Sequence, residues 1–171
     1  ALAAVRVTPA APENDALHIF IAAKLYPAKG VKVFLEAFAP HRHAGLRVSV
    51  AGDGSDEAAL RERFPWVHFL GWQNGAATLR LAAGAHVIVV PSVCEEACAS
   101  TVLEGLMLGK TVFALRLGGT PELAKYASQP QQLRLFDDMN SLARALVTFV
   151  PQPDRKIAPQ VRADAAHAAT R

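Results

Sequence analysis

Three acidic side chains stand out in the segment SVCEEACASTVLEGLML, because they lie among small and apolar residues. Glu95 and Glu96 are adjacent, and Glu104 interrupts an apolar helical pattern. All three have structural explanations: Thr101 and Glu104 have the spacing of a helix capping box, and the adjacent pair suits a solvated loop. The functional interpretation is that Glu96 and Glu104 line one cleft, where their carboxylates accept hydrogen bonds from neutral sugar hydroxyls.

Positive charge is expected close to these acids. Lys24 and Lys29 flank the turn in KLYPAKG, and Gly30 begins a helix behind it. Two cations beside a helix start favour the binding of a diphosphate, although two solvated lysines on a loop are an equally good explanation. The amides of the segment ASTV, at a second helix start, favour a further negative group. Lysines, amides and carboxylates together have the chemistry to bind every part of a nucleotide sugar.

Two glycine-containing turns follow predicted strands. The turn AGDGS carries Gly52 and Gly54 but lacks the third glycine of a dinucleotide-binding fingerprint, so by itself it is more typical of a structural turn. The turn RLGGTPE carries Gly118 and Gly119 directly before a helix start. Its backbone amides either meet an anion or sugar hydroxyls, or form a flexible turn between strand and helix, and the sequence favours neither.

Strand and helix patterns alternate between these segments, which indicates βαβ units around a parallel sheet. The apolar, β-branched runs predict strands at 17–23, 46–52, 67–71, 85–91, 111–115 and 132–136. Helical patterns predict helices at 30–39, 56–64, 75–83, 101–108, 120–127 and 138–150, the fifth with Thr120 as its N-cap. Strands that are apolar throughout suit a sheet covered by helices on both faces. We therefore predict an α/β fold, a Rossmann-like doubly wound parallel sheet of about six strands, with ligands at the carboxyl ends of the strands.

The composition is that of a globular domain. The chain has 171 residues, of which 51% are hydrophobic and 19% charged, and its formal net charge is +3. This mildly basic balance suits anionic ligands such as nucleotides but is too weak to indicate nucleic acid. No apolar run is long enough to predict a membrane span. Cys94 and Cys98 have poor spacing for a metal, so we expect two buried, reduced thiols in a cytosolic protein.

The two ends differ from the middle of the chain. Residues 1–16 are interpreted as a lead-in or linker, residues 17–150 as the nucleotide-sugar-binding domain, and residues 151–171 as a proline-rich linker with a tail helix. The start has neither an initiating Met nor the basic and long apolar regions of a signal peptide. We expect the chain to be a processed or excised piece of a longer protein.

Taken together, the motifs resemble the C-terminal, donor-binding domain of the GT-B glycosyltransferases of family 4, the retaining enzymes with an E-x7-E motif. Glu96 and Glu104 have that spacing, and the segment that contains them ends in the family's G-G-x-x-E. Upstream, AAKLYPAKGV is similar to the G-R-L-x-x-x-K-G segment, VAGDGS to the glycine turn and VHFLGW to the FLG strand. The similarity covers residues 17–150 in collinear order.

The resemblance implies roles for the charged residues. Lys24 and Lys29 bind the donor diphosphate, although Lys24 stands where arginine is commoner, which keeps the charge but loses the bidentate fork. Glu96 contacts hydroxyls of the transferred sugar, and Glu104 contacts those of the ribose. Glu96 and Lys29 are the expected catalytic residues.

The resemblance also implies contacts through the backbone. Ser100, Thr101 and Val102 cap a phosphate with their amides. Gly52 belongs to the glycine turn at the donor site, and the region after Gly71 approaches the base. No metal and no other cofactor is expected, because lysines and a helix N-terminus can stabilise a leaving diphosphate and the chain has no D-x-D motif.

The implied activity is transfer of a sugar, with retention, from a nucleotide-diphosphate sugar to a glycan, a lipid or another acceptor. In the family an N-terminal domain supplies the acceptor site, so this chain is expected to bind donor but to be inactive alone. Two alternatives remain open: a non-catalytic Rossmann-like module that binds a nucleotide or a partner, and an epimerase or phosphorylase of the same fold. The expected location is the cytoplasm, with peripheral contact of the whole enzyme at the inner face of the membrane as an alternative.

Overall fold

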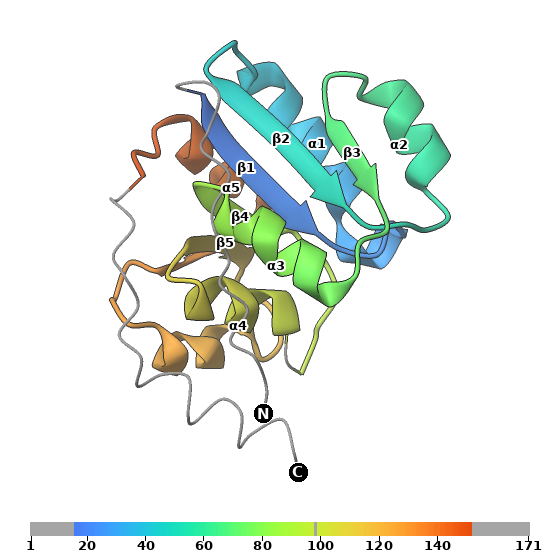
Figure 1. Ribbon diagram of the computed structural model, residues 1–171. Coiled ribbons are helices and arrows are strands. Elements are labelled where there is room, and N and C mark those ends of the chain that lie inside the picture. The colour runs from blue at the N-terminus through green and yellow to red at the C-terminus, as the bar shows by residue number, and fades with distance from the viewer. Residues whose placement is uncertain (1–15, 98, 152–171) are drawn as a thin grey trace.

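Six parallel strands form the centre of the molecule (Figure 1), in a computed structural model that describes residues 16–97 and 99–151. Their order across the sheet is β3-β2-β1-β4-β5-β6, and every neighbouring pair is parallel. The strands are β1 (Leu17–Ala22), β2 (Leu46–Ala51), β3 (His68–Gly71), β4 (Val87–Val90), β5 (Thr111–Leu115) and β6 (Leu133–Phe136). This is the predicted Rossmann-like doubly wound sheet, whose order reverses between β1 and β4.

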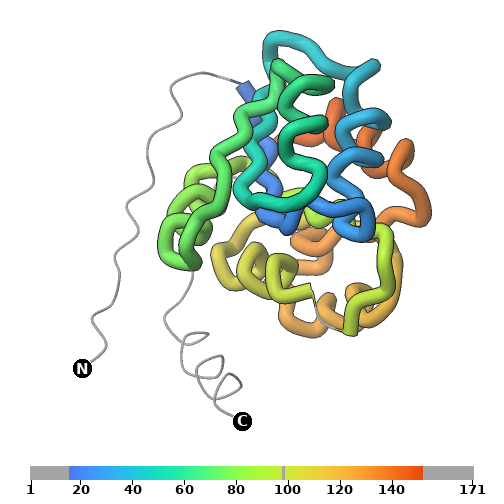
Figure 2. The backbone as a smooth tube through the Cα atoms, turned by 90° about the vertical axis from the view of Figure 1, so that its right-hand side faces the viewer, coloured from blue at the N-terminus to red at the C-terminus, as the bar shows by residue number. Residues whose placement is uncertain are grey.

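Helices connect the strands and cover both faces of the sheet. They are α1 (Val31–Phe38), α2 (Glu57–Arg63), α3 (Gly75–Ala83), α4 (Ser100–Met107) and α5 (Met139–Val147), with short 3-10 helices η1 (Pro27–Lys29), η2 (Ala39–His41) and η3 (Thr120–Tyr126). In Figure 1, α3 and α4 lie in front of the sheet while α1 and α5 lie behind it. Figure 2, turned by 90°, shows α1 and α3 on opposite sides of the strands.

The strands are apolar throughout because each face of the sheet has its own core. Ile19 and Ile21 on β1 pack with side chains of α1 and α5, whereas Phe20 between them packs with side chains of α3 and α4. On the first face, the rings of Phe34 and Phe38 stack with their centroids 5.5 Å apart. Burying an apolar side chain of this size contributes about 1.5–3 kcal/mol, so the alternating contacts of β1 fix it at the centre.

Two predicted helix starts are wrong. Thr120 is the first residue of η3, a 3-10 helix, and its N-cap is Gly119. The N-cap of α4 is Ala99, and no side chain caps that helix. Because α4 begins before Thr101, the capping box that this residue was expected to form with Glu104 is absent. The predicted buried thiol at Cys94 is half-buried and reduced. The predictions for Cys98 and for the terminal segments 1–15 and 152–171 lie outside the described residues.

Two glycines hold the loop after β1 against its neighbours. A Cβ on Gly30 would lie 1.9 Å from the carbonyl oxygen of Pro91, beyond β4, and a Cβ on Gly52 would lie 1.8 Å from that of Ala23. Both glycines have positive φ, 67° and 146°. Nearby, the amide of Val93 donates to the carbonyl of Ala28 at 3.1 Å. The loop between β1 and α1 is therefore fixed from both sides by backbone contacts.

A buried histidine lies near the opposite, amino-terminal edge of the sheet. The guanidinium of Arg47 donates to Nδ1 of His18 at 2.9 Å, so Nε2 carries the proton and donates to Ser49 at 3.0 Å. The amide of His18 donates to Nδ1 of His86 at 2.8 Å. Burial and the charge of Arg47 lower the pKa of His18 from 6.5 to about 4. This histidine is consequently neutral at pH 7.

Gly30→Ala is expected to destabilise the protein much more than Gly71→Ala. Both glycines have φ of 67°, so alanine at either position costs about 1 kcal/mol of left-handed strain. A Cβ at Gly71 meets nothing within 4 Å, whereas one at Gly30 collides with backbone. We expect Gly30→Ala to cost about 1–3 kcal/mol more in the free energy of unfolding, measured in urea. Equal losses would contradict the close contact.

His18→Gln is expected to flatten the dependence of stability on pH. The unfolded chain binds a proton at His18 near pH 6.5 and the folded chain only near pH 4, so stability falls as pH drops between these values. Between pH 7 and pH 5 this costs the wild type about 2 kcal/mol. His43→Gln, at an exposed histidine that is not among the groups acting on His18, serves as the control and should retain the full loss.

Candidate functional site

The parallel sheet brings loops from distant parts of the sequence to one edge, which we call the carboxyl rim. The loops after β1, β2, β4 and β5 all leave the sheet here, because each follows the carboxyl end of its strand. They carry Lys29, Gly52, Glu96 and Gly118 respectively. Four segments singled out in the sequence are thus placed on one edge, which is where open α/β sheets bind ligands.

Lys29 and Glu96 contact each other directly on the carboxyl rim. The ammonium of Lys29 donates to Oε1 of Glu96 at 2.7 Å, and the hydroxyl of Ser92 donates to the same oxygen at 2.6 Å. The side chains of Lys29 and Glu96 are 24% and 23% exposed. The pair is therefore largely shielded by protein while one side of it still faces solvent.

The ion pair keeps both groups charged. Burial pushes the pKa of Glu96 upward, but hydrogen bonds from Lys29 and Ser92 outweigh burial and hold this pKa below its usual range. The hydrogen bond to Glu96 raises the pKa of Lys29 in turn. A carboxylate and an ammonium are thus present side by side at neutral pH.

The glycine pair after β5 supports the backbone of Glu96. The amide of Gly119 donates to the carbonyl of Glu96 at 2.8 Å. A Cβ on Gly118, whose φ is 51°, would lie 2.6 Å from that carbonyl oxygen. From the sequence we predicted either an anion contact or a flexible connection for this turn. Neither interpretation included its support of the Glu96 backbone. The glycines let the loops after β4 and β5 pack closely, which fixes the position of the carboxylate.

Lys24 has a different partner from Lys29. Its ammonium lies 2.8 Å from Oδ1 of Asp53, in the loop after β2, and both side chains are about half exposed. An exposed pair of this kind contributes little to stability. The lysine is therefore easily recruited by another anion, but no contact joins it to Glu96 within the described residues.

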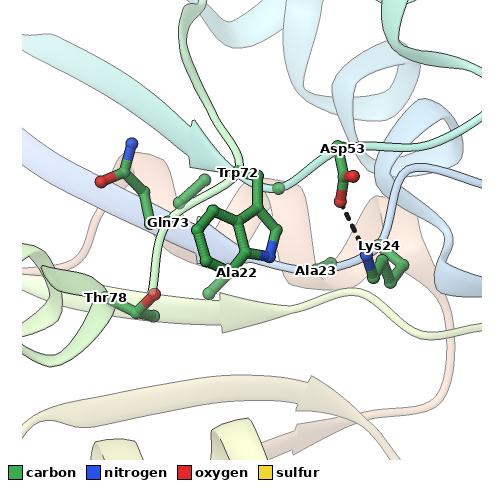
Figure 3. Close-up of a pocket in the computed structure, with 9 residues that line it drawn as sticks. Ala22, Ala23, Lys24, Asp53, Trp72, Gln73 and Thr78 are labelled. Atoms are coloured by element: carbon green, nitrogen blue, oxygen red, sulfur yellow. Dashed lines mark hydrogen bonds and ion pairs between the residues drawn. The ribbon is translucent and has the colours of Figure 1, made fainter. Parts of the chain in front are cut away.

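A hollow of about 160 Å³ lies beside Lys24, at the ends of β1, β2 and β3 (Figure 3). Trp72 is 64% exposed, and in Figure 3 its indole lies over the end of β1 beside Ala22. Thr78 on α3 lines the hollow on the side opposite Lys24. The full lining is Ala22, Ala23, Lys24, Ala51, Gly52, Asp53, Trp72, Gln73 and Thr78. Sequence reasoning pointed only to the region after Gly71 and missed the indole itself.

Glu104 lies on α4, one turn beyond the uncapped start of the helix. It is half-buried, and burial raises its pKa. Ser100, Thr101 and Val102 form the first turn of α4, and the amide of Val102 donates to the carbonyl of Ala99 at 2.9 Å. By their position the amides of Ser100 and Thr101 have no partner within the helix. Across the described ranges Glu104 forms no ion pair with Lys24 or Lys29. Its predicted role at the site stays a prediction.

The described residues contain no group of three or more His, Cys, Asp and Glu side chains placed to hold a metal ion. No helix in residues 16–97 or 99–151 has both the length and the apolar character needed to cross a membrane.

An α/β domain with a polar, charged carboxyl rim is typical of a broad class of ligand-binding proteins. Comparison of the sequence with protein families identifies the family within this class. Residues 16–151 match the sequence model of the glycosyl transferases group 1. The chain belongs to this family. A search of curated proteins finds no match.

Solved structures share the fold. Alr3699/HepE of Anabaena in complex with UDP has a TM-score of 0.67 and 20% identity, over 78% of this chain and 39% of that one. A glycosyltransferase from Rickettsia africae has a TM-score of 0.65 and 18% identity, over 78% and 37%. A mutant of S. aureus TarM in complex with Fondaparinux, alpha-GlcNAc-glycerol and UDP has a TM-score of 0.64 and 14% identity, over 84% and 30%. The chain therefore spans less than half the length of these proteins.

Lys29→Met is expected to raise the pKa of Glu96. Without the ammonium, burial of the carboxyl is opposed only by the weaker hydrogen bonds from Ser92 and Cys94. Carbon-13 NMR of the carboxyl group across a pH titration measures the change. Lys24→Met removes an equal charge from the same rim. Because Lys24 pairs with Asp53 and not with Glu96, this substitution should leave the pKa of Glu96 unchanged. A similar rise in both variants would show that the effect is not the ion pair.

Proposed function

We propose that this domain binds the nucleotide-diphosphate sugar of a retaining GT-B glycosyltransferase of family 4, which transfers the sugar to a glycan, a lipid or another acceptor. Membership of the glycosyl transferases group 1 supports this proposal. The observation that carries it is the pairing of Lys29 with Glu96 on the carboxyl rim, an ammonium for phosphate beside a carboxylate for hydroxyls.

In this proposal, the diphosphate binds between Lys29 and the start of α4. The amides of Ser100, Thr101 and Val102 lie in the first turn of α4, where the helix dipole favours negative charge, and that of Val102 would share its hydrogen with the carbonyl of Ala99. Lys24 adds a second cation after leaving Asp53. When the bond to the sugar breaks, these groups stabilise the charge that develops on the departing diphosphate, so the proposed reaction requires no metal.

The two acids of the E-x7-E motif bind hydroxyl groups. Glu96 accepts hydrogen bonds from the transferred sugar, next to the anomeric carbon that lies beside the diphosphate. Glu104 accepts hydrogen bonds from the ribose, and these would offset the burial that raises its pKa. In this arrangement Glu96 and Lys29 act at the reacting end of the donor, and Glu104 acts at the nucleoside end.

The hollow beside Trp72 is the proposed base site. An exposed indole offers a flat face for stacking, and alanines at 22, 23 and 51 leave room above the ends of the strands. Gly52 lets the backbone approach the nucleoside, and Gly71 begins the turn that presents the indole. Structures of Alr3699/HepE contain UDP, UDP-glucose, or UDP and glucose, which makes uridine the first nucleoside to test.

The rest of the enzyme is proposed to lie outside this chain. The chain covers 38% of Alr3699/HepE in its complex with UDP and glucose, so more than half of that protein lies outside the matched region. We propose that an N-terminal, acceptor-binding domain completes the site, and that this chain alone binds donor without turnover. The proposed location of the whole enzyme is the cytoplasm, with peripheral contact at the inner face of the membrane as the alternative.

Calorimetry with UDP, GDP and ADP, and with their sugar conjugates, tests the proposal. We expect one nucleotide series to bind, and Lys29→Ala to weaken it by roughly tenfold to a hundredfold, the value of a charge-assisted hydrogen bond. Glu104→Ala and Trp72→Ala should weaken binding as well, because they remove the ribose and base contacts.

Lys32→Ala is the matched control, because Lys32 is an exposed lysine on α1 three residues from Lys29. It should leave affinity unchanged. Binding of none of these nucleotides, or of NAD in their place, would count against the proposed function. A product assay on the full-length enzyme then distinguishes sugar transfer from epimerase or phosphorylase activity.

A further inference from the structure

We propose that the Lys29–Glu96 ion pair is a latch that makes the domain prefer a nucleotide-diphosphate sugar to the bare nucleoside diphosphate. The inference rests on the proposed function and adds a basis for discrimination between substrate and product. A transferase releases the nucleoside diphosphate after each transfer, so a product that binds as tightly as the donor competes with it for the site.

The latch follows from the fact that Lys29 already has a partner. Its ammonium lies 2.7 Å from Glu96, and the two side chains are only 24% and 23% exposed. A diphosphate gains Lys29 only if this hydrogen bond is broken or shared. Separating a largely shielded pair leaves a carboxylate without its counter-charge, which is costly. The separation of this ion pair therefore reduces the affinity of every phosphate ligand that binds Lys29.

The carboxylate cannot avoid this cost by moving away. Ser92 donates to the same Oε1 atom at 2.6 Å, and the amide of Gly119 holds the carbonyl of Glu96 at 2.8 Å. Gly118 has no Cβ, which allows the loop after β5 to lie directly against Glu96. The acid thus stays beside the place where a diphosphate would meet Lys29, and its negative charge repels that ligand.

Two ligands differ in what they offer the freed carboxylate. A bare nucleoside diphosphate ends in a charged phosphate that offers Glu96 no hydrogen-bond donor, so Glu96 loses its ammonium without a replacement. A sugar attached to the same diphosphate brings hydroxyl donors, which replace the lost hydrogen bond. The donor therefore offsets the free energy needed to separate Lys29 from Glu96, whereas the product does not. The domain should bind the nucleotide sugar more tightly than the nucleoside diphosphate.

Glu96→Gln tests the latch, because glutamine keeps the shape of the side chain and removes its charge. Calorimetry on the whole 171-residue chain with UDP and with UDP-glucose gives the affinities. We expect the variant to bind UDP about threefold to tenfold more tightly, the value of a partly shielded ion pair. UDP-glucose should gain less or bind more weakly, so the preference for the sugar conjugate shrinks.

Glu95→Gln is the matched control. It removes the same charge from the adjacent residue, whose side chain is exposed and forms no hydrogen bond or ion pair with Lys29 in the described part of the chain. It should change neither affinity. An equal gain in UDP affinity for both variants would overturn the latch, because it would reflect the overall charge of the rim. Unchanged or weaker UDP binding by Glu96→Gln would also overturn it.

A second variant separates the latch from direct repulsion. In a Lys29→Met background there is no ion pair to break, so adding Glu96→Gln should improve UDP binding clearly less than it does in the wild-type background. Ligand-detected NMR at millimolar UDP follows the weak complexes. Equal gains in both backgrounds would overturn the proposal. These results differ from failure of the proposed function itself, in which the wild-type chain binds neither UDP nor UDP-glucose.

Discussion

All six strands run in the same direction, and this constraint decides both the core and the site. Parallel strands cannot be joined by tight hairpins, so each connection crosses a face of the sheet and leaves a helix there. Both faces are then buried, which requires the strands to be apolar on both sides. The same direction brings every carboxyl end to one rim, where Lys29 and Glu96 meet although they lie 67 positions apart in the sequence.

The sequence was sufficient for the elements because their signals are local. A run such as that of β2 or β5 is apolar on both faces, and the predicted ranges agree with the structure to within a residue or two. Helix starts were less predictable. Thr101 has the residue type and spacing of a cap, but the packing of α4 sets its N-cap at Ala99. Side-chain capping is worth only about 1 kcal/mol, so tertiary contacts override it.

The sequence predicted which loops meet at the carboxyl rim but not how their side chains contact one another. Motif spacing named both lysines as phosphate ligands, and no local pattern could show that Lys29 is held by Glu96 while Lys24 is held by Asp53. These pairings join loops of different strands. The same is true of Gly118, whose missing Cβ matters only because the backbone of Glu96 lies against it. The burial and the pKa values of these side chains depend on such contacts, so they could not be predicted without the fold.

The lengths of the outer strands bear on how the domain behaves beside its own copies. The margin strands β3 and β6 have four residues each, as does the inner strand β4, whereas β1 and β2 have six. A margin strand exposes unpaired backbone groups that invite another chain to add on, and brevity together with a charged or bent end discourages this. Arg134 on β6 and the left-handed Gly71 that ends β3 supply those features. These features disfavour the addition of another chain at both margins of the sheet that the structure describes.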